Sequence, residues 1–459
     1  MAKQVNRHQE EGKEPSIYDK MQLVLRTGKL MLECGADTKR CVRDMLRTAA
    51  YLGMDWRRLQ LHMAYTTIML NVYEQGKSYT MFCKCYRHGV DLKTNLQVSG
   101  LSWQALRGKY SFERYDQELG RIEDALEKPL YSHCIRSLGA GLACSSFCRL
   151  FGGDLLACCF TLVASIIGWW LRFWGLRLEI NTYVCTALAA TLATLVAFVS
   201  LSWPLSSTPW YPMVACTLFL VPGVHLINAV DDFLNNYLIS GLARLLHGSL
   251  TVVAMTFGIV FALTLCKKPE ITELAIMPQS LYFSQGIAAA LAALGFAIIF
   301  NVPKRLLAIA ALGSSIAVCL RNFLAISCQI PLTEATFVGA AAVSIVGFIL
   351  LKSFHAPFFV ITIPAVIPLI PGVLLYRLLY DVILINQLTP GELLVGLQNG
   401  IEGALIILAI SLGVTLPDVV AHQFIEHRKQ KQLYKLLLEN NLDSSLAQKF
   451  ALDRASKRG

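Results

Sequence analysis

Long apolar runs follow one another through most of the chain and are separated by short polar, Pro or Gly-containing breaks. A helix needs about 20 residues to cross a bilayer, within a range of roughly 17–25, and most of these runs have that length. The pattern therefore predicts an α-helical integral membrane protein with about ten transmembrane helices. The ten runs are residues 132–151, 155–174, 183–203, 211–229, 238–266, 281–300, 306–323, 337–351, 358–380 and 393–414.

The chain before the first run has a different pattern, with short helical and strand-like segments. Apolar residues recur at helical spacing over 16–33, and Asp37 or Thr38 is a suitable cap for a second helix. Residues rich in Thr, Tyr, Met and Val at 59–73 and 78–86 predict short strands or a hairpin, and 91–106 and 111–126 predict two more helices. We therefore expect a small cytosolic α+β domain over residues 17–130.

Two apolar runs are interrupted by the same motif, which indicates an internal repeat. Leu220-Val-Pro-Gly-Val224 and Leu369-Ile-Pro-Gly-Val373 are offset by 371 − 222 = 149 residues. Two further pairs share that offset: Phe151 with Phe300, and Asp232 with Asp381. Five runs per repeat is an odd number, so two tandem copies must enter the membrane in opposite senses. The count predicts two inverted five-helix repeats, as in many secondary transporters.

Composition and charge agree with this division. The chain is 55% hydrophobic and 16% charged, whereas soluble proteins contain about 25% charged residues. Residues 1–133 hold 21 of the 41 Lys and Arg, and residues 134–417 hold only 12. The expected segments are a disordered N-terminus at 1–16, the α+β domain at 17–130, membrane repeats at 131–268 and 279–416, and a charged cytosolic tail at 417–459.

The formal net charge of +10 fits the basic residues that membrane proteins keep on cytoplasmic loops. Nucleic acid is not an expected partner, because no basic patch interleaved with aromatic residues stands out. The lipid bilayer is the expected partner, and assembly with a second copy stays open. No paired Cys-x-x-Cys sets occur, so the 14 cysteines do not predict a metal site or another cofactor.

The two breaks are the first candidates for substrate binding. Pro removes a backbone donor and Gly weakens the helix, so the chain should restart as a half-helix after Pro222-Gly223 and after Pro371-Gly372. A half-helix N-terminus offers free N–H groups and the positive end of the helix dipole. Asn228 lies near the first break and could bond a substrate or only a neighbouring backbone group.

Carboxylates within the apolar runs are the second group of candidates. Asp231 and Asp232 follow the first break, and Asp381 is the repeat counterpart of Asp232. These groups could bind an ammonium ion, carry a proton, or cap a loop, and Glu402 could also relay protons. Near the second break, Tyr376 and Arg377 could contact a substrate carboxylate, although Arg377 could instead form an i,i+4 pair with Asp381.

Several motifs together resemble the threonine/serine exporter family in its fused form, with both membrane halves in one chain. Leu30–Thr38 resembles the family's opening motif, and Leu220–Arg244 resembles its broken-helix segment. Residues 295–303 and 355–377 resemble the second half, which is a separate small protein in some relatives. Two departures are that Asp37 replaces the usual Glu and that Asp231 precedes Asp232.

The resemblance implies a secondary exporter of L-threonine and L-serine in the inner (plasma) membrane, with no enzymatic activity. No Walker A motif is present, so a proton gradient is the expected energy source. The alternative is an exporter of a small dicarboxylate such as succinate, because the relatives that carry the two membrane halves as separate proteins resemble exporters of that kind.

An alternative of another class assigns the function to the N-terminal domain, as a hydrolase or a ligand sensor. The polar residues concerned form no recognisable nucleophile–base motif. They are His62, Ser78, Cys83, Cys85 and His88.

Lys and Arg are more frequent on the loops that lie on the same side as the N-terminal domain, so both termini should be cytoplasmic. In a variant without native cysteines, Lys304→Cys should react with an impermeant maleimide only from the cytosolic side. Labelling of this cysteine from outside intact cells would contradict the ten-helix topology.

Overall fold

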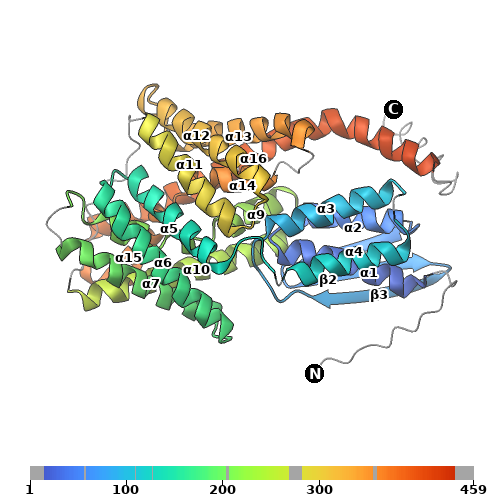
Figure 1. Ribbon diagram of the computed structural model, residues 1–459, viewed down its shortest axis with the longest axis horizontal. Coiled ribbons are helices and arrows are strands. Elements are labelled where there is room, and N and C mark those ends of the chain that lie inside the picture. The colour runs from blue at the N-terminus through green and yellow to red at the C-terminus, as the bar shows by residue number, and fades with distance from the viewer. Residues whose placement is uncertain are drawn as a thin grey trace.

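The structure is a computed structural model that describes residues 15–55, 58–108, 110–126, 128–202, 206–267, 282–354 and 359–439. It consists of a small N-terminal domain, called the head below, and a larger helical body (Figure 1). The expected disordered segment 1–16 and the end of the charged tail lie almost entirely outside the described residues.

The head begins with two capped helices. Ser16 and Asp19 form a capping box at the start of α1 (Ile17–Glu33). The Asp37 side chain accepts a hydrogen bond from the Arg40 amide at the start of α2 (Thr38–Tyr51). The other two helices of the head are α3 (Leu92–Leu106) and α4 (Phe112–Ala125). All four expected helices are therefore present.

The strand region differs from the sequence prediction, because the segment 59–73 contains two strands. A turn at Tyr65-Thr66 separates β1 (Leu59–Ala64) from β2 (Thr67–Glu74). β2 then pairs with β3 (Lys77–Lys84), so the sheet is antiparallel in the order β1-β2-β3. Apolar residues continue through Tyr65, so the pattern of hydrophobicity did not reveal the turn.

The body contains two successive sets of helices. The first set is α5 (His133–Leu150), α6 (Leu155–Arg177), α7 (Thr182–Phe198), α8 (Tyr211–Ala215), α9 (Gly223–Leu234) and α10 (Leu238–Leu265). The second set is α11 (Tyr282–Ile299), α12 (Lys304–Ile326), α13 (Leu332–Phe354), α14 (Phe359–Val366), α15 (Gly372–Ile383) and α16 (Pro390–Glu439). The bounds of α11, α12 and α15 each lie 149 residues after those of α5, α6 and α9 (282 − 133 = 304 − 155 = 372 − 223 = 149).

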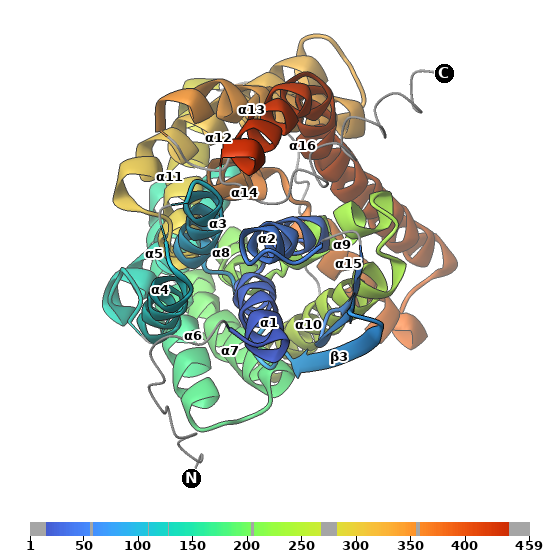
Figure 2. The ribbon, with the colours of Figure 1, turned by 90° about the vertical axis from the view of Figure 1, so that its right-hand side faces the viewer.

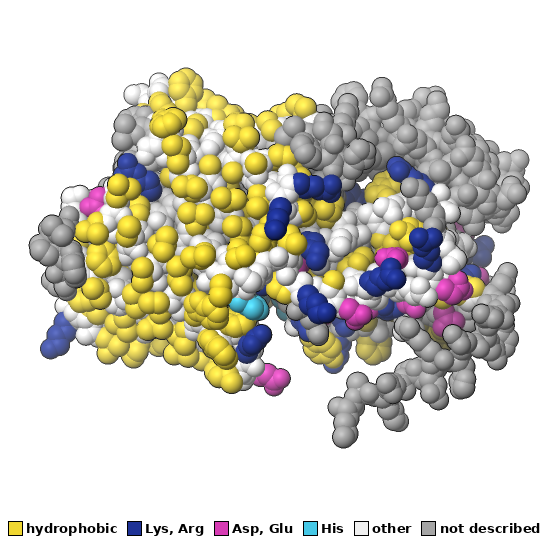
Figure 3. All heavy atoms as spheres, in the orientation of Figure 1, with side chains coloured by type: hydrophobic (Ala, Val, Ile, Leu, Met, Phe, Trp, Pro, Cys, Tyr) yellow, Lys and Arg dark blue, Asp and Glu magenta, His cyan; other side chains and the backbone are white. Residues whose placement is uncertain are grey.

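Six helices in the described residues are long and apolar enough to cross a membrane: α6, α7, α10, α11, α12 and the first part of α16. Two bent pairs of shorter helices raise the number to eight if each pair is one span. The expected number of ten would also require α5 and α13, so ten spans and an inverted repeat stay predictions. Apolar side chains cover the surface of the body, whereas charged side chains gather on the head (Figure 3).

The two sets of helices pack closely through small residues. α5 contacts α11, where an added Cβ on Gly295 would lie 2.4 Å from the Gly139 carbonyl oxygen. The contacts between the sets are also reciprocal, since α9 of the first set packs on α16 and α15 of the second set packs on α10. Each broken helix is therefore held by the last helix of the other set.

Candidate functional site

The two Pro-Gly breaks lie against each other in the centre of the body. An added Cβ on Gly223 would lie 2.3 Å from Ile370 Cδ1, and one on Gly372 would lie 3.1 Å from Leu218 and from Val221. Residues 221 and 370 are themselves repeat partners, so the contacts at the two breaks are reciprocal. The segments on either side of each break are bent by 57° and 51°.

The local geometry of the two breaks is the same. Pro222 and Pro371 precede the first helical residue with φ, ψ of −81°, 51° and −82°, 54°. Neither α9 nor α15 has a side-chain cap, so the N–H groups of the first turn depend on other partners. Free N–H groups at a helix N-terminus favour an anion.

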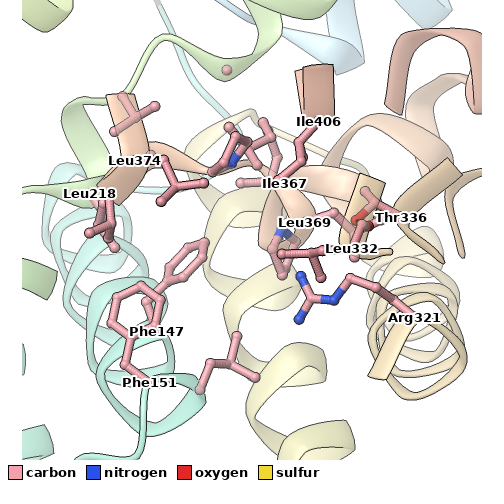
Figure 4. A pocket seen from close by; sticks show the side chains of 18 of the residues that line it. Phe147, Phe151, Leu218, Arg321, Leu332, Thr336, Ile367, Leu369, Leu374 and Ile406 are labelled. Atoms are coloured by element: carbon pink, nitrogen blue, oxygen red, sulfur yellow. The ribbon is translucent and has the colours of Figure 1, made fainter. Parts of the chain in front are cut away.

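A cavity of about 550 Å³ lies beside the breaks. Both breaks contribute to it, through Gly223 and through the first turn of α15 at 372–374. Figure 4 shows the Arg321 side chain reaching into this cavity, opposite Phe147 and Phe151. The polar lining residues are Arg321, Thr336, Arg377, Asn399 and Glu402. The lining thus contains two guanidinium groups and one carboxylate.

The cavity lies in the part of the body that is remote from the head. Its lining includes Leu150 and Phe151 at the end of α5, Ala325 and Ile326 at the end of α12, and Leu332 at the start of α13. The other end of α12 begins at Lys304, close to Asn301, whose side chain donates to Asp91 of the head at 2.7 Å.

A smaller cavity of about 230 Å³ adjoins the first one, with which it shares Arg377 and Asn399. Its other polar residues include Tyr376, Asp381 and Glu392. Asp381 is therefore close to the main cavity but is not among the residues that line it. Arg377 and Asp381, for which the sequence allows an i,i+4 pair, both line this smaller space.

The other repeat-related carboxylate, Asp232, lies at the contact between the head and the body. Its two oxygens accept hydrogen bonds from the backbone N–H and the hydroxyl of Thr38, both at 2.9 Å. Its Oδ2 also forms an ion pair with Arg244 Nε at 2.9 Å. The Asp232 and Arg244 side chains are almost fully buried, with 0% and 1% exposed. The carboxylate thus faces the N-terminus of head helix α2.

Neighbouring polar residues of the body also contact the head. Arg244 donates to the Ala36 carbonyl at 2.8 Å, and Asn228 donates to the Gly35 carbonyl at 2.9 Å. Asp231 instead accepts a hydrogen bond from Thr415 of α16 at 3.0 Å. The segment Gly35–Thr38, called the docking loop below, therefore binds to α9 and α10 through its backbone and through the Thr38 hydroxyl.

The structure thus places some of the predicted site residues in the cavity walls and others elsewhere. Those that line the cavities are Gly223, Pro371, Gly372, Tyr376, Arg377, Asp381 and Glu402. Pro222 precedes α9 at the break, whereas Asn228, Asp231 and Asp232 lie in contacts with the head or α16. Arg321, Thr336 and Asn399 line the main cavity and were not predicted. One signal was present in the sequence, because Arg321 follows Arg172 by the repeat offset of 149 residues.

Leucine at either break should abolish transport without preventing membrane insertion. Gly223→Leu and Gly372→Leu would place side-chain atoms where the two breaks already touch. Gly100→Leu is the matched control, because an added Cβ there meets no atom within 4 Å. Transport by vesicles that contain equal amounts of each protein tests this, and normal rates in both break variants would show that the breaks are only kinks.

The comparisons with known proteins agree with the two-part body. The ThrE family model, described as "Putative threonine/serine exporter", matches residues 22–266, and the ThrE_2 model, described as "Threonine/Serine exporter, ThrE", matches residues 285–420. No solved structure matches the chain significantly.

Two relatives carry the name "Probable succinate transporter subunit YjjP". The protein from Escherichia coli K12 is 28% identical over 245 residues, which cover 53% of this chain and 93% of the relative. The protein from Klebsiella aerogenes is 27% identical over 245 residues, which cover 53% of this chain and 92% of the relative. With one family model on each half, the chain belongs to the threonine/serine exporter (ThrE) family of transporters.

Proposed function

We propose that this protein is a secondary transporter that exports a small dicarboxylate across the inner membrane and binds it in the cavity beside the two breaks. The observation that carries this proposal is the charge of the cavity lining. Arg321 and Arg377 supply two guanidinium groups, and the uncapped first turn of α15 adds N–H donors. Arg binds carboxylates through paired hydrogen bonds, and a helix N-terminus favours the same ligands.

The positions of the aspartates support the same substrate class. A dianion is bound best where no permanent carboxylate competes for the cations. Asp231 and Asp232 have their described partners in Thr415, Thr38 and Arg244, and neither residue lines the cavity. The only carboxylate among the described lining residues is Glu402, which is exposed in the cavity wall.

Glu402 supports L-threonine or L-serine as the second candidate substrate. A zwitterion would place its carboxylate at Arg321 or Arg377 and its ammonium group at Glu402. The family name favours this substrate, whereas the two relatives are named for succinate. The two hypotheses differ in Glu402, which would be a ligand for an amino acid and a proton carrier for a dicarboxylate.

Proton coupling is the proposed source of energy. A proton on Glu402 would remove the negative charge that opposes a dianion, and release of that proton would weaken binding. Asp381 is a second candidate proton carrier. It lines the smaller cavity, and Arg377 lines both cavities. Intramembrane carboxylates serve this purpose in many transporters.

We further propose that the ten helices form two inverted five-helix repeats, with both termini in the cytoplasm. The equal offset of the helix bounds and the reciprocal packing of α9 on α16 and of α15 on α10 support this arrangement. If a two-fold axis relates the halves, movement of one half against the other can open the site first to one side of the membrane and then to the other. Assembly of more than one copy is compatible with this proposal but not required by it.

Arg321→Gln should raise the apparent KM for succinate by roughly 10-fold or more, the loss expected for a hydrogen bond between charged groups. The control is Arg305→Gln on the same helix, because Arg305 is exposed at its start. Proteoliposomes with an imposed pH gradient and labelled succinate, threonine or serine measure both the substrate and the energy source. Transport of threonine but not succinate would favour the zwitterion, and equal KM values for the two Arg variants would contradict the proposed site.

A further inference from the structure

The repeat offset identifies a counterpart of the main cavity on the side of the head. The cavity residues Arg321, Leu332, Leu374 and Arg377 correspond to Arg172, Tyr183, His225 and Asn228, each 149 residues earlier. These four residues, called the head-side set below, come from α6, α7 and α9. They carry a guanidinium, a phenol, an imidazole and an amide, which are all able to donate to a carboxylate.

The head occupies the space in front of the head-side set. Asn228 donates to the Gly35 carbonyl, and His225 Nε2 is 3.2 Å from the His88 carbonyl oxygen, both on the head. Tyr183 bonds His247 Nδ1 at 2.8 Å, and the ring of His247 lies 6.0 Å from that of His88. In the view from the head, α1 and α2 lie over the centre of the ring of body helices (Figure 2).

Buried polar atoms without a hydrogen-bond partner remain in this region. Among the described residues, Arg172 Nε and His88 Nδ1 are buried atoms without a hydrogen-bond partner. Such groups are rare in proteins, since a buried donor without a partner costs about 1–3 kcal/mol. An anion that entered between the head and the body would supply the missing acceptor for Arg172.

The head contacts both halves of the body on this side. The docking loop binds α9 and α10 of the first half through Asp232, Asn228 and Arg244. The start of α3 binds the second half, where Asn301 donates to Asp91 at 2.7 Å and Leu92 donates to Phe300. A movement of one half relative to the other must therefore break one of these two sets of contacts.

We propose that the head is the gate of a second carboxylate-binding half-site, formed by the head-side set and opened when the docking loop leaves α9 and α10. The latch of this gate consists of the hydrogen bonds from Thr38 to Asp232 and from Arg244 to the Ala36 carbonyl. Release of the latch removes Gly35 from Asn228 and His88 from His225, which leaves Asn228 and His225 free to bind the substrate beside Arg172. This inference rests on the proposed transport function and adds the place where the substrate enters on the side of the head.

Accessibility of the first turn of α9 tests the gate without a transport assay. Val224 is 3% exposed and directly precedes His225, whose Nε2 lies 3.2 Å from the His88 carbonyl oxygen of the head. In the full-length protein without native cysteines, Val224→Cys should react slowly with an impermeant maleimide added on the side of the head. Adding Thr38→Val or Asp232→Asn should increase that rate several-fold, because each substitution removes part of the latch.

Asp381→Asn is the matched control, because Asp381 is the repeat partner of Asp232 and lies in the smaller cavity away from the docking loop. It should leave the labelling of Val224→Cys unchanged. Unchanged labelling in both latch variants would overturn the gate, and Thr38→Val keeps the test valid if Asp232→Asn does not fold. A failure of the proposed substrate would appear only in the transport assay, so the two results can be separated.

Discussion

A helix that is broken inside a bilayer leaves backbone N–H and C=O groups without helical partners, and hydrocarbon cannot satisfy them. This constraint explains the centre of the protein. The two breaks at Pro222-Gly223 and Pro371-Gly372 are buried against each other, and each following helix packs on the last helix of the other half. Neither half can therefore bury its own break alone. The candidate site lies where two copies of the same broken segment meet.

The same arrangement makes the two sides of the body unequal. On the side remote from the head, the space beside the breaks is an open cavity with Arg321 and Arg377 in its wall. On the side of the head, the corresponding space is filled by Tyr183, His225, His247 and the docking loop. In the proposed transport cycle, this arrangement corresponds to a state that is open on the side remote from the head and closed on the side of the head. The head lies on only one of these two sides (Figure 1).

Much of the fold could be predicted from the sequence, because helical periodicity and the repeated Pro-Gly motif are local signals. The helices of the head, both breaks and the 149-residue offset are all visible in this way. The role of Asp232 was not visible, since Thr38 is 194 residues away in the chain and nothing in the local pattern connects them. The cavity-lining Arg321 was missed for a related reason, because its importance depends on the packing of α12 beside the second break. The motif Gly35–Thr38 was recognised as a family feature, but only the structure shows that its backbone binds the body.

In the proposed transport cycle, the docking loop of the head leaves α9 and α10 each time the gate opens. The Thr38 amide reports this directly, because it donates to the buried Asp232 carboxylate while the head is docked. Amide hydrogen exchange of residues 35–41 should be measured in the full-length protein in proteoliposomes, with and without substrate and a pH gradient. We expect slow exchange at rest and clearly faster exchange during turnover. Equally slow exchange during active transport would contradict the proposed gate, because the head would then be a fixed part of the closed side.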